Sequence, residues 1–281
     1  KILDANNVDT VITDIIGTSE NSMITSCDLS NLNLKTLPDD IGNLSHLQKL
    51  DLSNNNLQTF PDSLNKLTNL VELIADKNNL KEFPSELLQC TTLQILSLND
   101  NTIDSLPDSI HLLKNLTSLQ LDRNNLTKLS HSIGNLSKLT ILKLSENEIL
   151  SLPESIGNLK SLQKLYINYN YLTSFPLNFS SLSNLNYLEL SENRIQSLPT
   201  NIDLLQKLDY LDLSSNSIDS LPAEFSLLAD LTHCYLQDNQ LESLPDEIIL
   251  MSGLKKFYFD NNHLCDVSTK INKWLTTFDE D

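Results

Sequence analysis

The chain is short of the residues from which many catalytic and cofactor sites are built. It has only five glycines in 281 residues, and none of them belongs to a glycine-rich loop of the kind that cradles phosphate groups. Its four cysteines are too few for a disulfide-built scaffold, and no two of them are separated by only two residues. The five histidines show no metal-ligand spacing. We therefore expect no cofactor and no metal site.

Basic residues are also scarce. Nineteen lysines and arginines stand against 37 aspartates and glutamates, which gives a net charge of −18. This balance argues against nucleic acid and against an anionic membrane surface as partners, and it suits a partner with a cationic group. No apolar run approaches the ~20 residues that span a bilayer, so membrane insertion is not expected. The chain begins at Lys1 without an initiator methionine or a signal-peptide pattern, which indicates a processed or trimmed protein.

Asparagine, in contrast, recurs at one constant interval in ten consecutive places, each within the frame L-x-x-L-x-L-x-x-N-x-L. The apolar residues at the first, fourth and sixth positions point one way, which predicts a short strand with one buried face. A side-chain amide can donate to one backbone carbonyl and accept from a neighbouring repeat's N–H, so the stacked asparagines predict a hydrogen-bonded ladder. The ladder positions are Asn55, Asn78, Asn101, Asn124, Asn147, Asn170, Asn193, Asn216, Asn239 and Asn262.

All nine prolines follow a leucine or phenylalanine behind the frame, as in Leu37-Pro38, and the one repeat without proline has Ser130 there. Proline lacks an N–H donor, so this segment is predicted to be extended or a turn rather than a paired strand. Ile-Gly-Asn-Leu at 41–44, 133–136 and 156–159 then predicts short helical or 3₁₀ turns.

The two ends depart from the repeat, because terminal repeats have no neighbour to cover their core. Residues 1–23 carry apolar side chains at helical spacing and predict a helical N-terminal cap. Eleven repeats follow over 24–264, and 265–281 is predicted to be a C-terminal cap in which Trp274 covers the last strand. One continuous core predicts a single domain, 1–281.

Three cysteines, Cys27, Cys90 and Cys234, occupy apolar positions of the repeat and are interpreted as small core residues. Cys265 lies one strand from Cys234. A bridge between those two is conceivable, but free thiols are the expectation.

These frames, with Leu-Pro-x-x-Ile-Gly-x-Leu behind them, resemble the 23-residue leucine-rich repeats of the Ras-suppressor-like class, which are also abundant in bacterial surface and secreted proteins. The tail with Trp274 and Leu275 resembles the closing segment of bacterial members. The resemblance implies an α/β leucine-rich-repeat solenoid: a curved horseshoe with a parallel sheet on the concave face and short 3₁₀ or turn segments on the convex face. It also implies a role in binding proteins, peptides or glycans, and it favours a secreted or cell-surface location over the cytoplasm.

The third, fifth, seventh and eighth positions of each frame are left free to face outward, and Tyr169 stands at the eighth. Tyrosine is confined to repeats 6–10, counted from the repeat of Asn55, whereas the earlier repeats carry residues such as serine, glutamine, aspartate and lysine there. Because neighbouring strands are ~4.8 Å apart, Tyr187, Tyr210 and His233 should form one column, with Glu189 and Asp212 in the next. The predicted partner-binding residues are Tyr166, Tyr169, Tyr187, Glu189, Tyr210, Asp212, His233, Tyr235 and Tyr258.

The leading hypothesis is a non-catalytic, monomeric module that binds a protein or peptide through this tyrosine-rich concave face. A glycan-binding surface protein that uses the same face is the main alternative, and a structural spacer is the second. Glu189 and Asp212 are the only acid–base pair that suggests an enzyme. An open sheet excludes water poorly and no nucleophile accompanies the pair, so we expect no catalysis.

Overall fold

The computed structural model describes residues 24–265 and 267–278. The predicted N-terminal cap, 1–23, lies outside the described residues. The chain divides into two compact units, residues 1–141 and 142–281, and the division falls inside strand β6 (Ile141–Lys143). The single domain, 1–281, stays a prediction.

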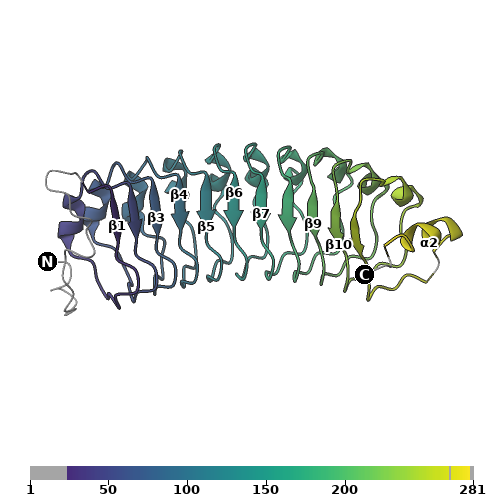
Figure 1. The fold of residues 1–281 in the computed structure, drawn as a ribbon, viewed down its shortest axis with the longest axis horizontal. Helices are drawn as coiled ribbons and strands as arrows, with labels where there is room; N and C mark the ends of the chain where they lie inside the picture. The colour runs from purple at the N-terminus through teal and green to yellow at the C-terminus, as the bar shows by residue number, and fades with distance from the viewer. Residues whose placement is uncertain (1–23, 266, 279–281) are drawn as a thin grey trace. The chain divides into compact units, whose positions relative to one another are not determined.

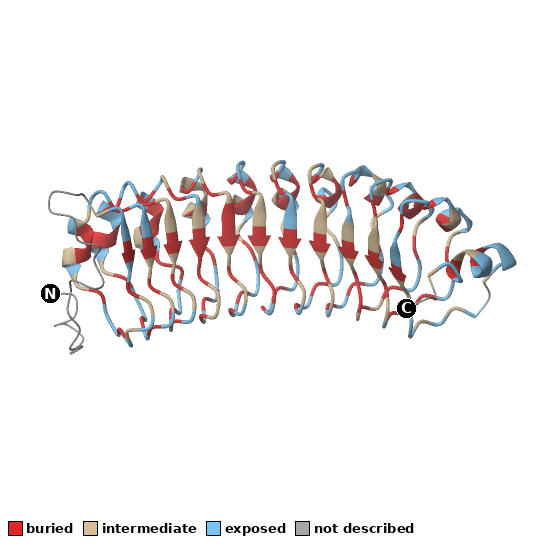
Figure 2. Ribbon diagram, in the orientation of Figure 1, coloured by how far each residue is buried: buried red, intermediate tan, exposed pale blue. Residues whose placement is uncertain are grey.

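Each frame forms a strand of three residues whose central side chain is buried in the core (Figures 1 and 2). The first unit contains β1 (Ser26–Asp28), β2 (Lys49–Asp51), β3 (Glu72–Ile74), β4 (Ile95–Ser97) and β5 (Ser118–Gln120). The second unit contains β7 (Lys164–Tyr166), β8 (Tyr187–Glu189), β9 (Tyr210–Asp212), β10 (His233–Tyr235) and β11 (Lys256–Tyr258). Within each of these sets, consecutive strands pair in parallel, and each residue faces the residue at the same position of the next repeat. The predicted parallel solenoid is confirmed.

Each of the strands β1–β10 is followed by a short 3₁₀ helix, as the sequence predicts. These helices are η2 (Asp39–Asn43), η3 (Asp62–Lys66), η4 (Ser85–Gln89), η5 (Asp108–Leu112), η6 (His131–Asn135), η7 (Glu154–Asn158), η8 (Phe179–Ser181), η9 (Ile202–Leu204), η10 (Ala223–Leu227) and η11 (Asp246–Leu250). Ser130, which replaces proline, accepts a hydrogen bond from the Ser132 N–H at 3.1 Å and so caps η6 with its side chain. Glycine is required at position 157, because a Cβ there would lie 2.2 Å from the Asn178 carbonyl oxygen.

The asparagine ladder is confirmed, and Asn193 shows its geometry. The side-chain Nδ2 donates to Ile167 O of the preceding repeat and to Leu190 O of its own repeat, both at 3.0 Å. Its Oδ1 accepts from the Leu172 N–H at 3.0 Å. One buried amide therefore satisfies backbone groups of two repeats that would otherwise be buried without partners.

The core of both units consists mainly of leucine and isoleucine from the frame, and the cysteines follow the prediction. Cys27, Cys90 and Cys234 are buried, Cys265 is exposed, and all four are free thiols, so no bridge joins Cys234 to Cys265. None of the helices in the described part of the chain has the length and apolar character that crossing a bilayer requires.

Helix α2 (Thr269–Leu275) follows the last strand of the second unit. Its side chains Ile271 and Leu275 are buried, and the Trp274 ring lies 5.3 Å from the ring of Phe257, the central residue of β11. Trp274 thus covers the end of the core, as predicted for it.

The ladder predicts a large difference between two asparagines of the same unit. Asn193→Ala should lower the free energy of unfolding by about 1–3 kcal/mol, because it leaves buried backbone groups unpaired. Asn158→Ala, on the exposed end of η7, should change it by no more than about 0.5 kcal/mol. Urea denaturation of both variants measures this, and equal midpoints would contradict the ladder's role.

Candidate functional site

The outward side chains of β7–β11 form a surface that we call the tyrosine face. The strand register arranges it in two columns, which run across the strands. The first column is Lys164, Tyr187, Tyr210, His233 and Lys256. The second is Tyr166, Glu189, Asp212, Tyr235 and Tyr258. All ten residues belong to the second unit.

The tyrosine rings of this face form one continuous ladder. Tyr187 and Tyr210 are nearly parallel, with ring centroids 4.3 Å apart and an angle of 9° between their planes. Tyr166 lies 5.0 Å from Tyr187 at one end. At the other end the ladder crosses from Tyr210 to Tyr235 at 5.2 Å and continues to Tyr258 at 5.2 Å. The ring contacts therefore link five strands without a gap.

His233 extends the first column as predicted, but its ring lies 6.2 Å from Tyr210, farther than that of Tyr235. The path of the ladder, which changes column from Tyr166 to Tyr187 and again from Tyr210 to Tyr235, is a feature that the sequence pattern did not reveal. It arises because Glu189 and Asp212 occupy the second column on β8 and β9, where the ladder follows Tyr187 and Tyr210 instead.

The two carboxylates lie half-buried beside the stacked rings. The Tyr187 hydroxyl donates a hydrogen bond to Glu189 Oε1. Asp212 Oδ1 accepts from the Ser214 N–H at 2.9 Å and from the Ser214 hydroxyl at 2.6 Å. Among the described residues, these contacts engage only one oxygen of each carboxylate, so the other oxygen of each remains able to accept from a partner.

Burial and the carboxylates shift the ionisation of the stacked tyrosines. Burial, then the hydrogen bond to Glu189 and the charge of that carboxylate, raise the pKa of Tyr187 far above its ordinary value. Burial, followed by the charges of Asp212, Tyr235 and Glu189, raises the pKa of Tyr210 to about 12. Both rings therefore remain neutral hydrogen-bonding groups at physiological pH.

Lysines lie over the rings at the β7 end of the face, a feature that the sequence analysis missed. Lys164 Nζ is 5.8 Å from the centroid of Tyr187, and Lys143 Nζ is 5.5 Å from that of Tyr166. In both cases the lysine holds the same position as its tyrosine in the preceding repeat, so the repeat period contains the signal.

Tyr169 is the one tyrosine of the predicted site that lies outside the ring ladder. It lies on the turn just after β7, with 53% of its surface exposed, and its φ of 53° is in the left-handed region. The equivalent residues of other repeats are polar, as with Asn54 and Asn261. Nearby, the exposed Tyr171 ring lies 4.4 Å from the Arg194 guanidinium. Both tyrosines extend the aromatic surface beyond the C-terminal end of β7.

The outward face of the first unit has no tyrosine, and its polar side chains bond to one another. Lys49 forms a salt bridge of 3.0 Å with Glu72 across neighbouring strands. Asp76 Oδ1 accepts from the Ser97 hydroxyl at 2.7 Å and from the Asn99 N–H at 2.8 Å.

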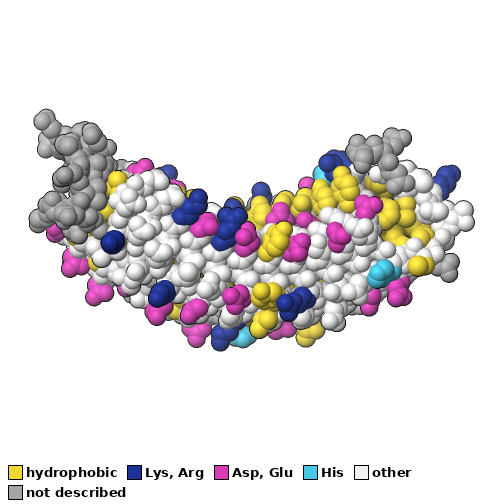
Figure 3. Space-filling view, turned by 90° about the horizontal axis from the view of Figure 1, so that it is seen from below, with side chains coloured by type: hydrophobic (Ala, Val, Ile, Leu, Met, Phe, Trp, Pro, Cys, Tyr) yellow, Lys and Arg dark blue, Asp and Glu magenta, His cyan; other side chains and the backbone are white. Residues whose placement is uncertain are grey.

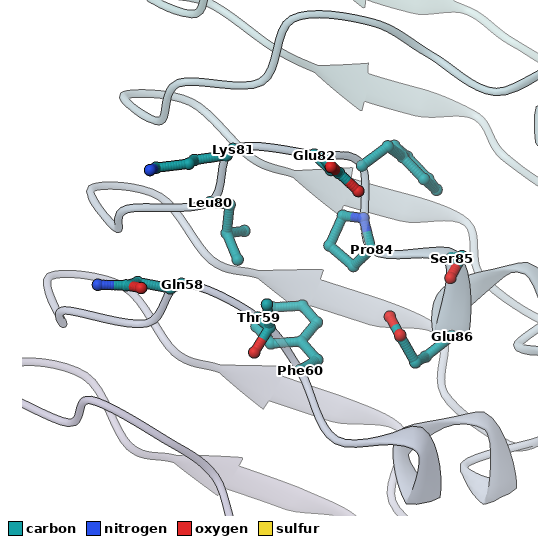
Figure 4. A pocket seen from close by; sticks show the side chains of 10 residues that line it. Gln58, Thr59, Phe60, Leu80, Lys81, Glu82, Pro84, Ser85 and Glu86 are labelled. Atoms are coloured by element: carbon teal, nitrogen blue, oxygen red, sulfur yellow. The ribbon is translucent and has the colours of Figure 1, made fainter.

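Two hollows outside the tyrosine face recur with the repeat. In the first unit a hollow of about 270 Å³ lies between two successive loops, where Phe60 and Pro84 form its lining and Lys81 points away from it (Figure 4). The second unit has a similar hollow of about 360 Å³ lined by Phe175 and Pro199, which occupy the equivalent repeat positions. A hollow that recurs with the repeat is a packing feature, so the tyrosine face remains the better candidate.

The surface of the molecule shows hydrophobic side chains, with tyrosine counted among them, gathered in a patch with acidic side chains at its border (Figure 3).

Within the described residues, no group of three or more histidine, cysteine, aspartate or glutamate side chains is placed to hold a metal ion. The site therefore consists of rings, two carboxylates and flanking lysines.

The model of the leucine-rich repeat region matches this chain over residues 27–119, 85–180 and 170–276. The chain is a leucine-rich-repeat protein. No protein of curated function matches the sequence. The Ras-suppressor-like or bacterial subclass stays a prediction.

Among solved structures, this leucine-rich-repeat chain is similar to the ectodomain of the Arabidopsis thaliana receptor kinase GASSHO1/SCHENGEN3, solved in complex with CASPARIAN STRIP INTEGRITY FACTOR 2. The identity is 30%, the TM-score is 0.79, and the match covers 89% of this chain and 32% of the ectodomain. The chain thus spans about a third of the length of that ectodomain.

Two further structures are similar. A leucine-rich-repeat protein of Leptospira interrogans matches with 30% identity and a TM-score of 0.52, covering 89% of this chain and 81% of that one. The plant peptide hormone receptor RGFR1, solved in complex with RGF2, matches with 28% identity and a TM-score of 0.66, covering 85% of this chain and 48% of the receptor.

The raised tyrosine pKa predicts that stability depends on alkaline pH. Tyr210 has a pKa of about 12 in the folded protein against an ordinary value of 10.0. The folded state therefore binds the phenol proton more tightly, and the resulting stability is fully present below pH 10 and is lost as the pH rises through 12. The thermal midpoint should fall across this window, and it should fall less in a Tyr187→Phe, Tyr210→Phe double variant. Identical pH profiles for the two proteins would contradict the assignment.

The left-handed backbone at Tyr169 predicts a stabilising substitution. Tyr169→Asn should raise the free energy of unfolding by about 0.5–1 kcal/mol, because asparagine tolerates this conformation better than a bulky residue. Tyr171→Asn, which loses the contact with Arg194 and relieves no such strain, should not stabilise the protein. Differential scanning calorimetry measures both, and a lower midpoint for Tyr169→Asn would show that the ring makes a stabilising contact.

Proposed function

We propose that this protein is a non-catalytic binding module that recognises a protein or peptide through the tyrosine face of β7–β11. The observation that supports this most is the unbroken ring ladder from Tyr166 to Tyr258, with two half-buried carboxylates beside it. Tyrosine gives a large contact area at a low cost in side-chain entropy, and its hydroxyl adds a hydrogen bond, which is why it is common in binding hot spots.

Similar proteins support a peptide or protein as the partner. The plant peptide hormone receptor RGFR1 shares the fold and was solved with RGF2, and the GASSHO1/SCHENGEN3 ectodomain was solved with CASPARIAN STRIP INTEGRITY FACTOR 2. Both are longer than this chain, so we carry over only the use of a repeat surface to bind such a partner.

The packing of the rings favours a peptide over a glycan. A sugar stacks on an open aromatic face, but Tyr187 and Tyr210 cover each other at 4.3 Å, and Tyr235 and Tyr258 are paired at 5.2 Å with a 12° angle. Paired rings offer their edges and hydroxyls to a partner instead, which suits the backbone and side chains of a peptide. A cationic group on the peptide would meet Glu189 and Asp212.

The proposal predicts a sharp difference between two outward residues. Random dodecapeptides displayed on phage are selected on the full chain, and the dissociation constants of recovered peptides are then measured by fluorescence anisotropy. Tyr210→Ala should weaken binding about 30-fold, or ~2 kcal/mol, because it removes the ring through which the ladder crosses. Gln120→Ala, an outward residue of β5 in the first unit, should change it less than about twofold.

A glycan array on the same two variants separates the alternatives. Recovery of glycans whose binding is lost in Tyr210→Ala, with no peptide that depends on Tyr210, would replace the peptide by a glycan. Peptides that bind wild type and Tyr210→Ala equally would place the site on another surface.

A further inference from the structure

We propose that the tyrosine face selects an extended peptide segment whose charged groups follow the order anionic, cationic, anionic along β7–β11. This inference rests on the proposed function and specifies the chemistry of the partner. It concerns the charged residues that lie beside the ring ladder and at its ends: Lys164, Glu189, Asp212 and Lys256.

The strand register fixes the order of these charges. Lys164 and Lys256 occupy the two ends of the first column, on β7 and β11. Glu189 and Asp212 are direct neighbours in the second column, on β8 and β9. A ligand that crosses the strands therefore meets a positive end, a negative centre and a second positive end.

The ring ladder sets the direction of the ligand. Each strand is only three residues long, whereas the contacts among Tyr166, Tyr187, Tyr210, Tyr235 and Tyr258 pass from one strand to the next. A ligand that contacts several of these rings must lie across the strands, and this path takes it past the charged residues in the stated order.

The strand spacing gives the distance between the charges on the ligand. Neighbouring strands are ~4.8 Å apart. Measured across the strands, the midpoint between Glu189 on β8 and Asp212 on β9 therefore lies ~7 Å from β7, which carries Lys164, and ~12 Å from β11, which carries Lys256. An extended peptide advances ~3.3 Å per residue. The cationic residue should therefore stand about two residues from one anionic group and about four residues from the other.

The environments of the charges suit this role. Lys164 and Lys256 are exposed, so each can follow a flexible anionic side chain. Lys143, with its Nζ over Tyr166, adds a second positive charge at the β7 end. Glu189 and Asp212 are half-buried beside the rings, where screening by water is weaker and a charge-assisted bond to arginine or lysine is stronger. Each has one oxygen already held in place, by Tyr187 or Ser214.

Charge also argues against a second copy of this chain as the ligand. Two copies would each bring a net charge of −18 to the contact, whereas a short segment needs only one cation and two flanking anions. The occupant is thus a peptide segment of a different protein, with arginine or lysine at its centre.

The test compares peptide selections on wild type and on a charge-reversed chain. The reversed chain carries Lys164→Glu, Glu189→Lys, Asp212→Lys and Lys256→Glu, and keeps the net charge at −18. Wild type should enrich phage-displayed dodecapeptides with acidic, basic and acidic residues in order. The reversed chain should enrich the opposite order. Each recovered peptide should bind the other chain at least about tenfold more weakly, which corresponds to 1.4 kcal/mol.

A variant with fewer substitutions controls for the case in which the chain with all four substitutions fails to fold. Lys164→Glu with Lys256→Glu alters only exposed side chains. It should keep the central basic residue in the recovered peptides and exchange the flanking acidic residues for basic ones. Circular dichroism and the thermal midpoint of both variants are compared with those of wild type.

The outcomes separate this inference from the proposed function. Peptides that need Tyr210 but show no charge order, or whose flanking residues do not change on the variant with fewer substitutions, would overturn the charge order and leave the binding face in place. A set of peptides none of which needs Tyr210 would overturn the proposed function, and the charge order with it.

Discussion

The buried side-chain amide of the repeated asparagine is the interaction on which the rest of this structure depends. Each amide bonds backbone groups of its own repeat and of the repeat before it, as Asn193 does with Leu190, Ile167 and Leu172. An inserted or deleted residue would remove the amide from these groups and leave them buried without partners. The constant length of the repeat is therefore a physical requirement, and it holds the strands in a register that repeats without drift.

That register converts a one-dimensional sequence into a two-column surface. Side chains at the same position of successive repeats stand on neighbouring strands, so aromatic residues there come into ring contact, as Tyr187 and Tyr210 do at 4.3 Å. The same alignment places like-charged Glu189 and Asp212 side by side, and the cationic group of the proposed peptide would relieve their repulsion. The fold holds these groups in place before a ligand arrives, which lowers the entropy cost of binding.

The repeat pattern was sufficient to predict the strands, the 3₁₀ turns, the ladder and the outward position of the tyrosines, because each depends only on position within the repeat. It predicted the columns for the same reason. It did not predict the crossing from Tyr210 to Tyr235, the lysines over Tyr166 and Tyr187, or the left-handed backbone at Tyr169. The crossing depends on side-chain rotamers and the left-handed backbone on the detailed turn, and neither follows from an apolar period. The repeat period does align each lysine with its tyrosine, but the contact of its Nζ with the ring again depends on the rotamer. The predicted cap at 1–23 lies outside the described residues.

Oxidative footprinting by mass spectrometry tests the binding face most directly. Hydroxyl radicals modify exposed tyrosines, and a bound peptide should protect the rings that it covers. With a peptide selected on the wild-type chain, we expect protection of Tyr187, Tyr210 and Tyr235, while the exposed leucines Leu204, Leu227 and Leu250 on η9, η10 and η11 keep their rate of modification. Protection of those leucines with unchanged modification of Tyr187 and Tyr210 would contradict the account and place the binding surface on the 3₁₀ helices.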